Sequence, residues 1–360
     1  MEPLKNIIPL ALRVAGYMAL CTLAVYGQEF VHPGLLHNSE DLDRIREKIR
    51  SGSEPWVSGW DKLQSVEVSS LDYKATPIKR LVVASGGKAG AAQQYDAGAA
   101  HFHAIQWCIT GKEAHAHKAI EIINDWSYEL EELSGSNAML QAGITGFKFC
   151  NAAEILKYTY HGWSAEDVAK FEQMMRGIYY PVIRDFSRLT TNGNWDAYMM
   201  LTMISIGVFL DDREIFNRAV DYFHTGKGKG AITHYVFESG QCQESNRDQF
   251  HVQMGLGALA GTCEIAYKQG VDLYGAFNNR LLKGYEFSAR YNLGYPVVAE
   301  GELSSRGQGR FQPIWEIAHN HYVKRLGLKA EFTSEVIKKI RPEGFHHDFI
   351  SFGTLFFVDE

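Results

Sequence analysis

The segment 238–257 combines carboxylate, guanidinium and imidazole side chains at helical spacing. Arg247 and His251 are four residues apart and Glu244 precedes Arg247 by one turn, so all three share one face of a predicted helix. A guanidinium binds an anionic group and an imidazole moves a proton, which predicts acid–base chemistry on an anionic ligand. The apolar residues 254–266 predict a buried helix whose polar start faces a cleft; the alternative is a solvated, salt-bridged first turn.

The segment TTNGNWDAYMM, residues 190–200, places two amides beside a tryptophan. Its first four residues predict a loop, and Asn194 or Asp196 is a predicted cap of the next helix. One interpretation is a helix cap with a packed indole. The other is a sugar site, in which Trp195 offers a flat face to a pyranose ring and Asn194, with Asn192 in reserve, binds a carboxylate.

Three further places supply candidate contacts to the same ligand. Arg306 and Arg310 lie in a loop rich in serine and glycine, a composition that suits an anionic ligand at the edge of a cleft. Gln243 lies in the loop before the Arg247 helix, and Tyr95 and His101 lie at the start of another predicted helix. We therefore include these five side chains, together with Glu244, Asn192 and Trp195, among the predicted substrate-binding residues.

Together these groups match the needs of β-elimination on a polymer of uronic acids. Neutralising the substrate carboxylate makes the neighbouring C5 proton acidic enough to remove, after which the C4–O bond breaks. Asn194 is the predicted neutraliser and Arg247 its charge partner. His251 is either a second neutraliser or the base, and a tyrosine is the other candidate for base or acid.

The composition excludes some other classes of function. The chain has 360 residues, of which 46% are hydrophobic and 22% charged, as expected for a globular protein with a sizeable core. Its formal net charge of -6 offers no basic field for nucleic acid. Cys108, Cys150, Cys242 and Cys263 are widely spaced and match no zinc pattern, and His319 and His321 are interpreted as ordinary histidines. We therefore expect no metal and no cofactor.

The first 27 residues are typical of a secretory signal peptide. Lys5 and Arg13 precede a short apolar run, and Gly27 is a plausible cleavage point. The run is short for a membrane span, although a membrane anchor is the alternative. Residues 28–360 then form one domain, which we expect to be periplasmic or secreted, with no stable membrane insertion after cleavage.

Helical periodicity dominates the predicted domain, and alternation typical of strands is scarce. Short loops join the helices in a repeating hairpin pattern. The helix expected over 195–210 is apolar nearly all round, so it must be buried on more than one side. These features predict an all-α fold, an (α/α) toroid or incomplete barrel of six or seven helix pairs around a central cleft.

Several of these segments resemble the alginate lyase superfamily of toroid polysaccharide lyases. The similarity is carried by NGNWDAY, ESNRDQFHVQMGLGALAGTCEIAYKQGVDLYG, ARYNLG and PIWEIAHNHY, and it covers about residues 30–357. Polysaccharide lyase family 38 is the most similar, and family 5 is more distant. The resemblance implies metal-independent elimination on alginate or glucuronan, with Asn194, Arg247 and His251 at the positions of the family's neutralising residues.

One position departs from the pattern of that superfamily. A catalytic tyrosine usually follows the arginine by about two helical turns, but here the residue is Met254. The base is therefore either His251 or a tyrosine from elsewhere. Tyr291 is the leading candidate, ahead of Tyr285 and Tyr322.

Two other functions compete with elimination. A glycoside hydrolase needs a pair of carboxylates, for which Asp96, Asp196, Glu244 and Glu316 are available but not obviously paired. A non-catalytic glycan-binding protein would keep Trp195 and the arginines without a base. Among lyase substrates, we expect mannuronate-rich alginate, with glucuronan as the alternative.

Overall fold

The computed structural model describes residues 29–84, 88–186 and 191–359. The chain divides into Met1–Val31 and His32–Glu360, and the helices and strands named below all belong to the second unit. The expected signal peptide, residues 1–27, lies outside the described residues. No helix in the described ranges is both long and apolar enough to cross a membrane.

The unit is almost entirely helical, as predicted. Its helices are α2 (Ser39–Arg50), α3 (Trp56–Gln64), α4 (Lys88–Thr110), α5 (Glu113–Glu129), α6 (Ala138–Thr159), α7 (Ala165–Met174), α8 (Tyr180–Ile183), α9 (Gly193–Phe209), α10 (Arg213–Thr225), α11 (Ile232–Tyr235), α12 (Gln249–Lys268), α13 (Ala276–Asn292), α14 (Trp315–His319), α15 (Glu331–Ile340) and α16 (Gly353–Phe357). Short π-helical turns extend α7 over Met175–Tyr179 and α14 over Asn320–Arg325, and a 3₁₀ turn spans Glu67–Ser69.

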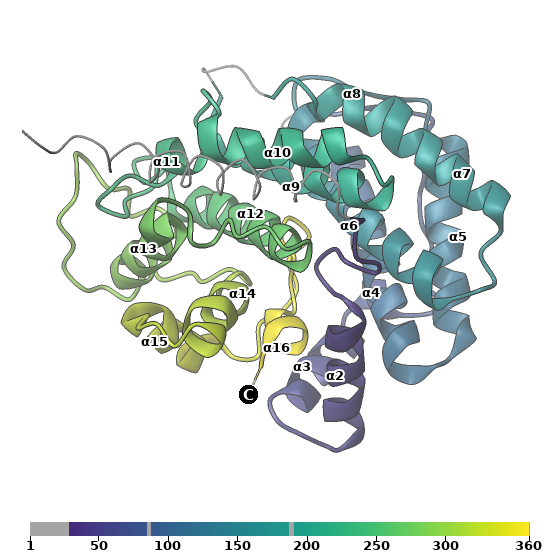
Figure 1. The fold of residues 1–360 in the computed structure, drawn as a ribbon, viewed down its shortest axis with the longest axis horizontal. Helices are drawn as coiled ribbons and strands as arrows, with labels where there is room; N and C mark the ends of the chain where they lie inside the picture. Colours follow the sequence, from purple (N-terminus) through teal and green to yellow (C-terminus); the bar gives the residue numbers. More distant parts are fainter. Residues whose placement is uncertain (1–28, 85–87, 187–190, 360) are drawn as a thin grey trace, which may run out of the picture. The chain divides into compact units, whose positions relative to one another are not determined.

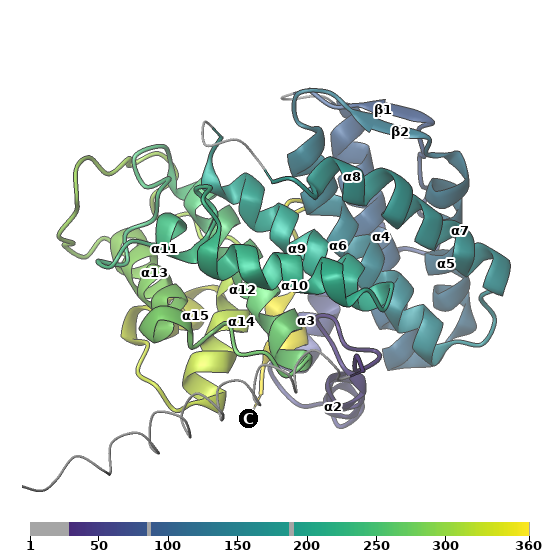
Figure 2. The same cartoon turned by 45° about the horizontal axis from the view of Figure 1, so that its top comes forward.

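Two small strands complete the secondary structure. β1 (Arg80–Val82) and β2 (Glu132–Ser134) form a parallel pair in which Arg80 lies opposite Glu132. The pair lies beside α4, α6 and the π-helical turn that precedes α8 (Figure 2). It sits at the edge of the helical layers and does not interrupt them.

The helices form two layers that follow one curve (Figure 1). In the inner layer, α4 packs against α6, α6 against α9, and α9 against α12. In the outer layer, α5 covers α4, α10 covers α9 and α13 covers α12, while α8 packs on α6. Together with the pairs α2–α3 and α14–α15, this arrangement is the predicted toroid of helix hairpins.

The inner helix α9 is buried nearly all round, because α6, α10 and α12 pack against it. Sixteen of the seventeen residues of α9 are buried, which explains its continuous apolar sequence. Close approach between α6 and α9 depends on Gly143, where an added Cβ would lie 2.8 Å from the backbone carbon of Tyr198. A larger side chain at this position would push two core helices apart.

A segment between α15 and α16, residues 344–352, runs through the interior of the toroid (Figure 1), and we call it the C-terminal strap. The Lys148 ammonium of α6 donates to the carbonyl of His347, and the Tyr198 hydroxyl of α9 donates to the carbonyl of Asp348 at 2.5 Å. On α12, the Phe250 ring packs edge-on against Phe349. Three inner helices therefore fix the position of the strap.

Two buried histidines in the core make the stability of the fold sensitive to acid. His37 and His101 are both fully buried, and none of their ring nitrogens has a hydrogen-bond partner among the described residues. Burial, only partly offset by Asp41, lowers the pKa of His37 from 6.5 to about 4. Burial, with His37 and Lys148 nearby, also lowers the pKa of His101 well below its usual value.

We expect stability to fall as the pH drops from 6.5 toward 4. In that window the unfolded chain binds a proton at His37 that the folded protein excludes, so acid favours unfolding. His37 alone should contribute a loss of about 2 kcal/mol at pH 5 relative to pH 7. Urea unfolding at the two pH values measures this loss, and His37→Leu should reduce it. An equal loss in the variant would contradict the assignment.

Candidate active site

Glu244 joins the two segments that the sequence analysis singled out. Its carboxylate accepts hydrogen bonds from the Asn194 backbone N–H at 3.0 Å, the Asn194 side-chain amide at 2.7 and 2.8 Å, and Arg247 Nη1 at 2.8 Å. The Gln243 side chain accepts the neighbouring Gly193 N–H at 2.9 Å. Because α9 has no side-chain cap of its own, these two residues satisfy the free N–H groups at its start.

In this arrangement Asn194 and Glu244 bond to each other, whereas the sequence predicted that they contact the substrate. Both side chains have no exposed surface, and the Asn194 amide N–H groups point to Glu244. Burial raises the pKa of Glu244, although the hydrogen bonds from Asn194 and Arg247 oppose this effect. As placed, the two residues hold the start of α9 and the Arg247 guanidinium, which remains partly exposed.

Asp248 orients the imidazole of His251. It caps α12 by accepting the His251 backbone N–H at 2.8 Å, and its carboxylate oxygens lie 2.8 Å from His251 Nδ1. Burial favours a raised pKa for Asp248, but hydrogen bonds from Arg306 and His251 hold that pKa below its usual value. The ionised carboxylate therefore accepts a hydrogen bond from the Nδ1–H group of His251, which leaves the lone pair of that ring on Nε2.

A cavity of about 460 Å³ opens at His251. Its lining includes Asp248, Phe250, His251, Arg306, Arg310 and His346. A second cavity of similar volume shares Phe250 and His251 and extends past Gln141, Met254 and His347. The first cavity thus combines an available imidazole lone pair with two exposed arginines, as an elimination on an anionic sugar requires.

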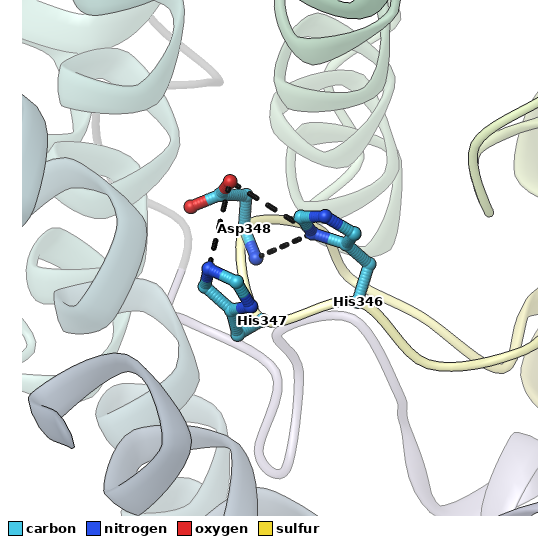
Figure 3. A group of neighbouring side chains, drawn as sticks. All are labelled: His346, His347 and Asp348. Atoms are coloured by element: carbon cyan, nitrogen blue, oxygen red, sulfur yellow. Dashed lines mark hydrogen bonds and ion pairs between the residues drawn. The ribbon is translucent and has the colours of Figure 1, made fainter. Parts of the chain in front are cut away.

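The strap contributes His346, His347 and Asp348, which the sequence analysis did not select (Figure 3). Their side chains lie beside α6 and α12, and burial lowers the pKa of the neighbouring Lys148 from 10.5 to about 7. The only local signal was the dipeptide His346-His347 before an acid. Nothing near it in the sequence indicates that these residues reach the cavities.

The donor atoms of these three residues all lie within 4.8 Å of one another, so we tested them as a metal site. The two imidazole rings are stacked at 4.6 Å with an angle of 17° between their planes. Lone pairs in nearly parallel planes do not converge on one ion. In addition, Nδ1 of His346 already accepts the Asp348 N–H at 3.2 Å (Figure 3), so this arrangement does not fit a metal without rotating both rings.

Comparison with known proteins identifies the family. A model of the alginate lyase family matches residues 88–297, which is more than half of the chain. The chain belongs to the alginate lyase family. It is therefore a polysaccharide lyase, as the resemblance implied, while the assignment to family 38 or 5 stays a prediction.

Solved alginate lyases share the fold of this lyase. Alginate lyase A1-III from Sphingomonas species A1 aligns over 89% of this chain and 95% of its own, with a TM-score of 0.66 and 14% identity. A Tyr-to-Phe variant of A1-III in complex with a tetrasaccharide gives the same TM-score at 15% identity, covering 89% of this chain and 94% of its own. An alginate lyase from Bacteroides ovatus gives 0.64 at 13% identity, covering 92% and 100%. No curated protein matches.

The predicted sugar contacts of the lyase fall into two groups. Arg306 and Arg310 line the first cavity with His251, and Tyr95 lies 5.0 Å from the ring of His347, which lines the second. Trp195 is half-buried, but neither Trp195 nor Asn192 is among the described residues that line these two cavities. The roles of these residues in sugar binding stay predictions.

His101 lies in a different environment from the predicted one. It is fully buried beside the rings of His37, Phe102 and Phe356, and it lines neither cavity. The prediction rested on its place near the start of a predicted helix, but α4 is an inner helix and turns this position into the core. A substrate in either cavity does not reach it in this arrangement.

The candidate tyrosines of the lyase are not placed as bases in these cavities. The Tyr285 hydroxyl donates to the carbonyl of Ile314 at 3.0 Å, the Tyr322 hydroxyl donates to that of Tyr274 at 3.0 Å, and both rings are fully buried. Tyr291 is half-buried near the end of α13, and its carbonyl accepts a hydrogen bond from the Gln308 side chain. Gln308 lies in the loop that contains Arg306 and Arg310, which we call the arginine loop. Among the described residues that line the two cavities, none is a tyrosine.

The carboxylates of the hydrolase alternative have structural partners. Asp96 binds the Tyr73 hydroxyl at 2.5 Å and the Trp126 indole at 2.8 Å. Asp196 binds the Tyr222 hydroxyl at 2.7 Å, and Glu316 binds Arg341 at 2.7 Å. These contacts are scattered over separate helices, so the described residues supply no pair of these carboxylates facing one sugar bond.

Proposed function

We propose that this lyase cleaves mannuronate-rich alginate by β-elimination in the cavity at His251, with glucuronan as the alternative substrate. The observation that carries the proposal is the Asp248–His251 pair: Asp248 engages Nδ1, and the imidazole lines the same cavity as Arg306 and Arg310. The solved relatives named above are alginate lyases, and one was solved with a tetrasaccharide. These names support a uronate polymer as the substrate here.

In the proposed reaction, the arginines bind the substrate carboxylate and His251 moves the proton. Arg306 is 69% exposed although it contacts Asp248, and Arg310 is also exposed. Their guanidinium groups stabilise the charge that forms when His251 Nε2 removes the C5 proton. In mannuronate and glucuronate, the C5 hydrogen and the C4 oxygen lie on one face of the ring. The same imidazolium then returns the proton to the departing oxygen.

Met254 supports His251 as the base. This side chain lies at the position where the resemblance expects a tyrosine, and it lines the second cavity. A thioether neither accepts nor donates a proton under these conditions. Among the residues of α12 that line the two cavities, Phe250 and Met254 carry no titratable group, so the His251 imidazole is the one that can move a proton there.

The function is tested by following the ultraviolet absorbance of the unsaturated product. The purified protein is incubated with polymannuronate, polyguluronate, glucuronan and a galacturonan, each with and without a chelator. We expect a chelator-resistant rise with polymannuronate that is largest among the four. New reducing ends without this absorbance would indicate hydrolysis, and binding without either signal would indicate a glycan-binding protein.

We also propose that residues 1–27 direct the lyase out of the cytoplasm. The charged start and the short apolar run support this assignment. N-terminal sequencing of the exported protein is expected to begin after Gly27. A mature chain that retains the apolar run would indicate a membrane anchor instead.

A further inference from the structure

A second imidazole lines the cavity that contains His251. His346 of the strap and His251 of α12 both line it, and the Phe250 ring packs against both imidazoles. The ring centroid of Phe250 is 5.6 Å from that of His251 and 5.3 Å from that of His346. The fold therefore brings two histidines, 95 residues apart in the chain, to one site.

The hydrogen bonds at Nδ1 make the two Nε2 atoms differ: that of His251 is an acceptor, and that of His346 is a donor. Asp248 is an ionised acceptor at Nδ1 of His251, so that ring carries its proton on Nδ1 and has a lone pair on Nε2. At His346, Nδ1 accepts the backbone N–H of Asp348 at 3.2 Å, whereas the nearest carboxylate oxygen of Asp348 lies 3.8 Å from Nδ1, beyond hydrogen-bond distance. The neutral His346 ring therefore carries its proton on Nε2.

The surroundings hold this form of His346 in place. Ser351 Oγ accepts the His346 backbone N–H at 3.0 Å and donates to the His346 carbonyl at 3.0 Å. Lys148 and Tyr198 fix the next two carbonyls of the strap. Burial, with His347 and Lys148 nearby, lowers the pKa of His346 to about 4, so the ring is neutral near pH 7.

We propose that His346 is a further catalytic residue, whose neutral Nε2–H donates a hydrogen bond to the substrate carboxylate as negative charge builds on it during elimination. This inference rests on the proposed function. It assigns to His346 the neutral donor role that the sequence analysis gave to Asn194, whose own amide is buried and bonded to Glu244. A rigid neutral donor stabilises the forming enolate by a hydrogen bond and keeps its own proton.

The electrons and the proton of the elimination step are all accounted for while His346 acts only as a hydrogen-bond donor. The C5–H electrons form the C4=C5 double bond, and the C4–O electrons leave with the oxygen. The C5 proton passes to His251 Nε2 and then to that oxygen. His346 keeps its proton throughout, and no oxidant, reductant or metal enters the step.

Substitutions of His346 separate hydrogen-bond donation from a packing role. His346→Leu removes the N–H group, and we expect kcat on the preferred uronan to fall by about 10²–10³-fold with a smaller change in KM. His346→Gln places an amide N–H near the position of Nε2 and should recover most of this loss. Thermal unfolding of both variants checks that the strap remains folded.

Each outcome of this series decides the proposal. Unchanged kcat in His346→Leu would overturn it, and so would equal losses in the leucine and glutamine variants, which would indicate a packing role. If the wild-type protein eliminates none of the uronans, the proposed function fails and this inference fails with it. An active wild-type protein with an unaffected leucine variant overturns the inference alone.

The protonated nitrogen of the His346 ring can be identified without measuring activity. In the protein labelled with ¹⁵N-histidine, long-range proton–nitrogen spectra distinguish a ring protonated on Nε2 from one protonated on Nδ1. We expect the His346 signals, assigned by their loss in His346→Gln, to show the Nε2–H form at pH 7. Adding a mannuronate oligosaccharide to an inactive His251→Ala protein should shift them. An Nδ1–H form would overturn the proposal.

Discussion

Replacing His251 with alanine is expected to lower kcat by about 10²–10⁴-fold on the preferred uronan, the range in which a positioned acid–base group acts. The imidazole is the group that accepts the C5 proton in the proposed reaction, and Met254 and Phe250 cannot replace it. Binding of the polymer should remain, because Arg306 and Arg310 still line the cavity. Initial rates of ultraviolet absorbance measure kcat, and calorimetric titration with an oligosaccharide measures binding.

A matched variant tests how His251 is oriented. In Asp248→Asn, the side chain keeps its size, but the charge that stabilises the imidazolium is lost and the amide N–H can donate to Nδ1, which favours the other tautomer. Its kcat should therefore fall between those of the wild-type protein and His251→Ala. Activity that is unchanged in His251→Ala would remove the imidazole from proton transfer. A loss of binding in that variant would assign it to substrate binding instead.

Replacing Glu244 with leucine is expected to lower the free energy of unfolding by about 3–5 kcal/mol, the usual cost of removing one partner from a buried charged network. The substitution leaves the backbone N–H and amide of Asn194 without an acceptor in a site that has no exposed surface. It also frees the Arg247 guanidinium from its partner at 2.8 Å. Urea unfolding at pH 7 measures the change.

An exposed ion pair provides the control for this prediction. Glu47 of α2 pairs with Arg50 at 2.5 Å, and both side chains are exposed. Glu47→Leu should change the free energy of unfolding by at most about 1 kcal/mol, because exposed pairs contribute little. Similar effects of the two substitutions would show that Glu244 does not organise the start of α9.

The helical fold could be predicted because its signals are local. The apolar run of α9 and the amphipathic spacing of the outer helices each appear within one segment of sequence. The arginine loop was also predictable, because glycines and arginines in one short segment indicate an anionic ligand. Arg306, Arg310 and His251 do line one cavity in the structure.

The remaining features of the site depend on contacts between distant segments. Asn194 was predicted to face the substrate, but Glu244, 50 residues away, accepts the hydrogen bonds of its side-chain amide. Asp248 was not selected, because its contact with Arg306 joins residues 58 positions apart in the chain and has no local signal. His346 has no local signal, since its place depends on strap contacts with Lys148 and Tyr198 that span 199 and 150 residues.

Those long spans have a consequence for the order of folding. Helix pairs form from neighbours in the chain, whereas the strap must find α6, α9 and α12 after their layers are assembled. A refolding chain is therefore expected to regain its helical circular dichroism before it regains catalysis. In that interval the layers exist without the residues that complete the cavity, so helix content alone does not report a finished enzyme.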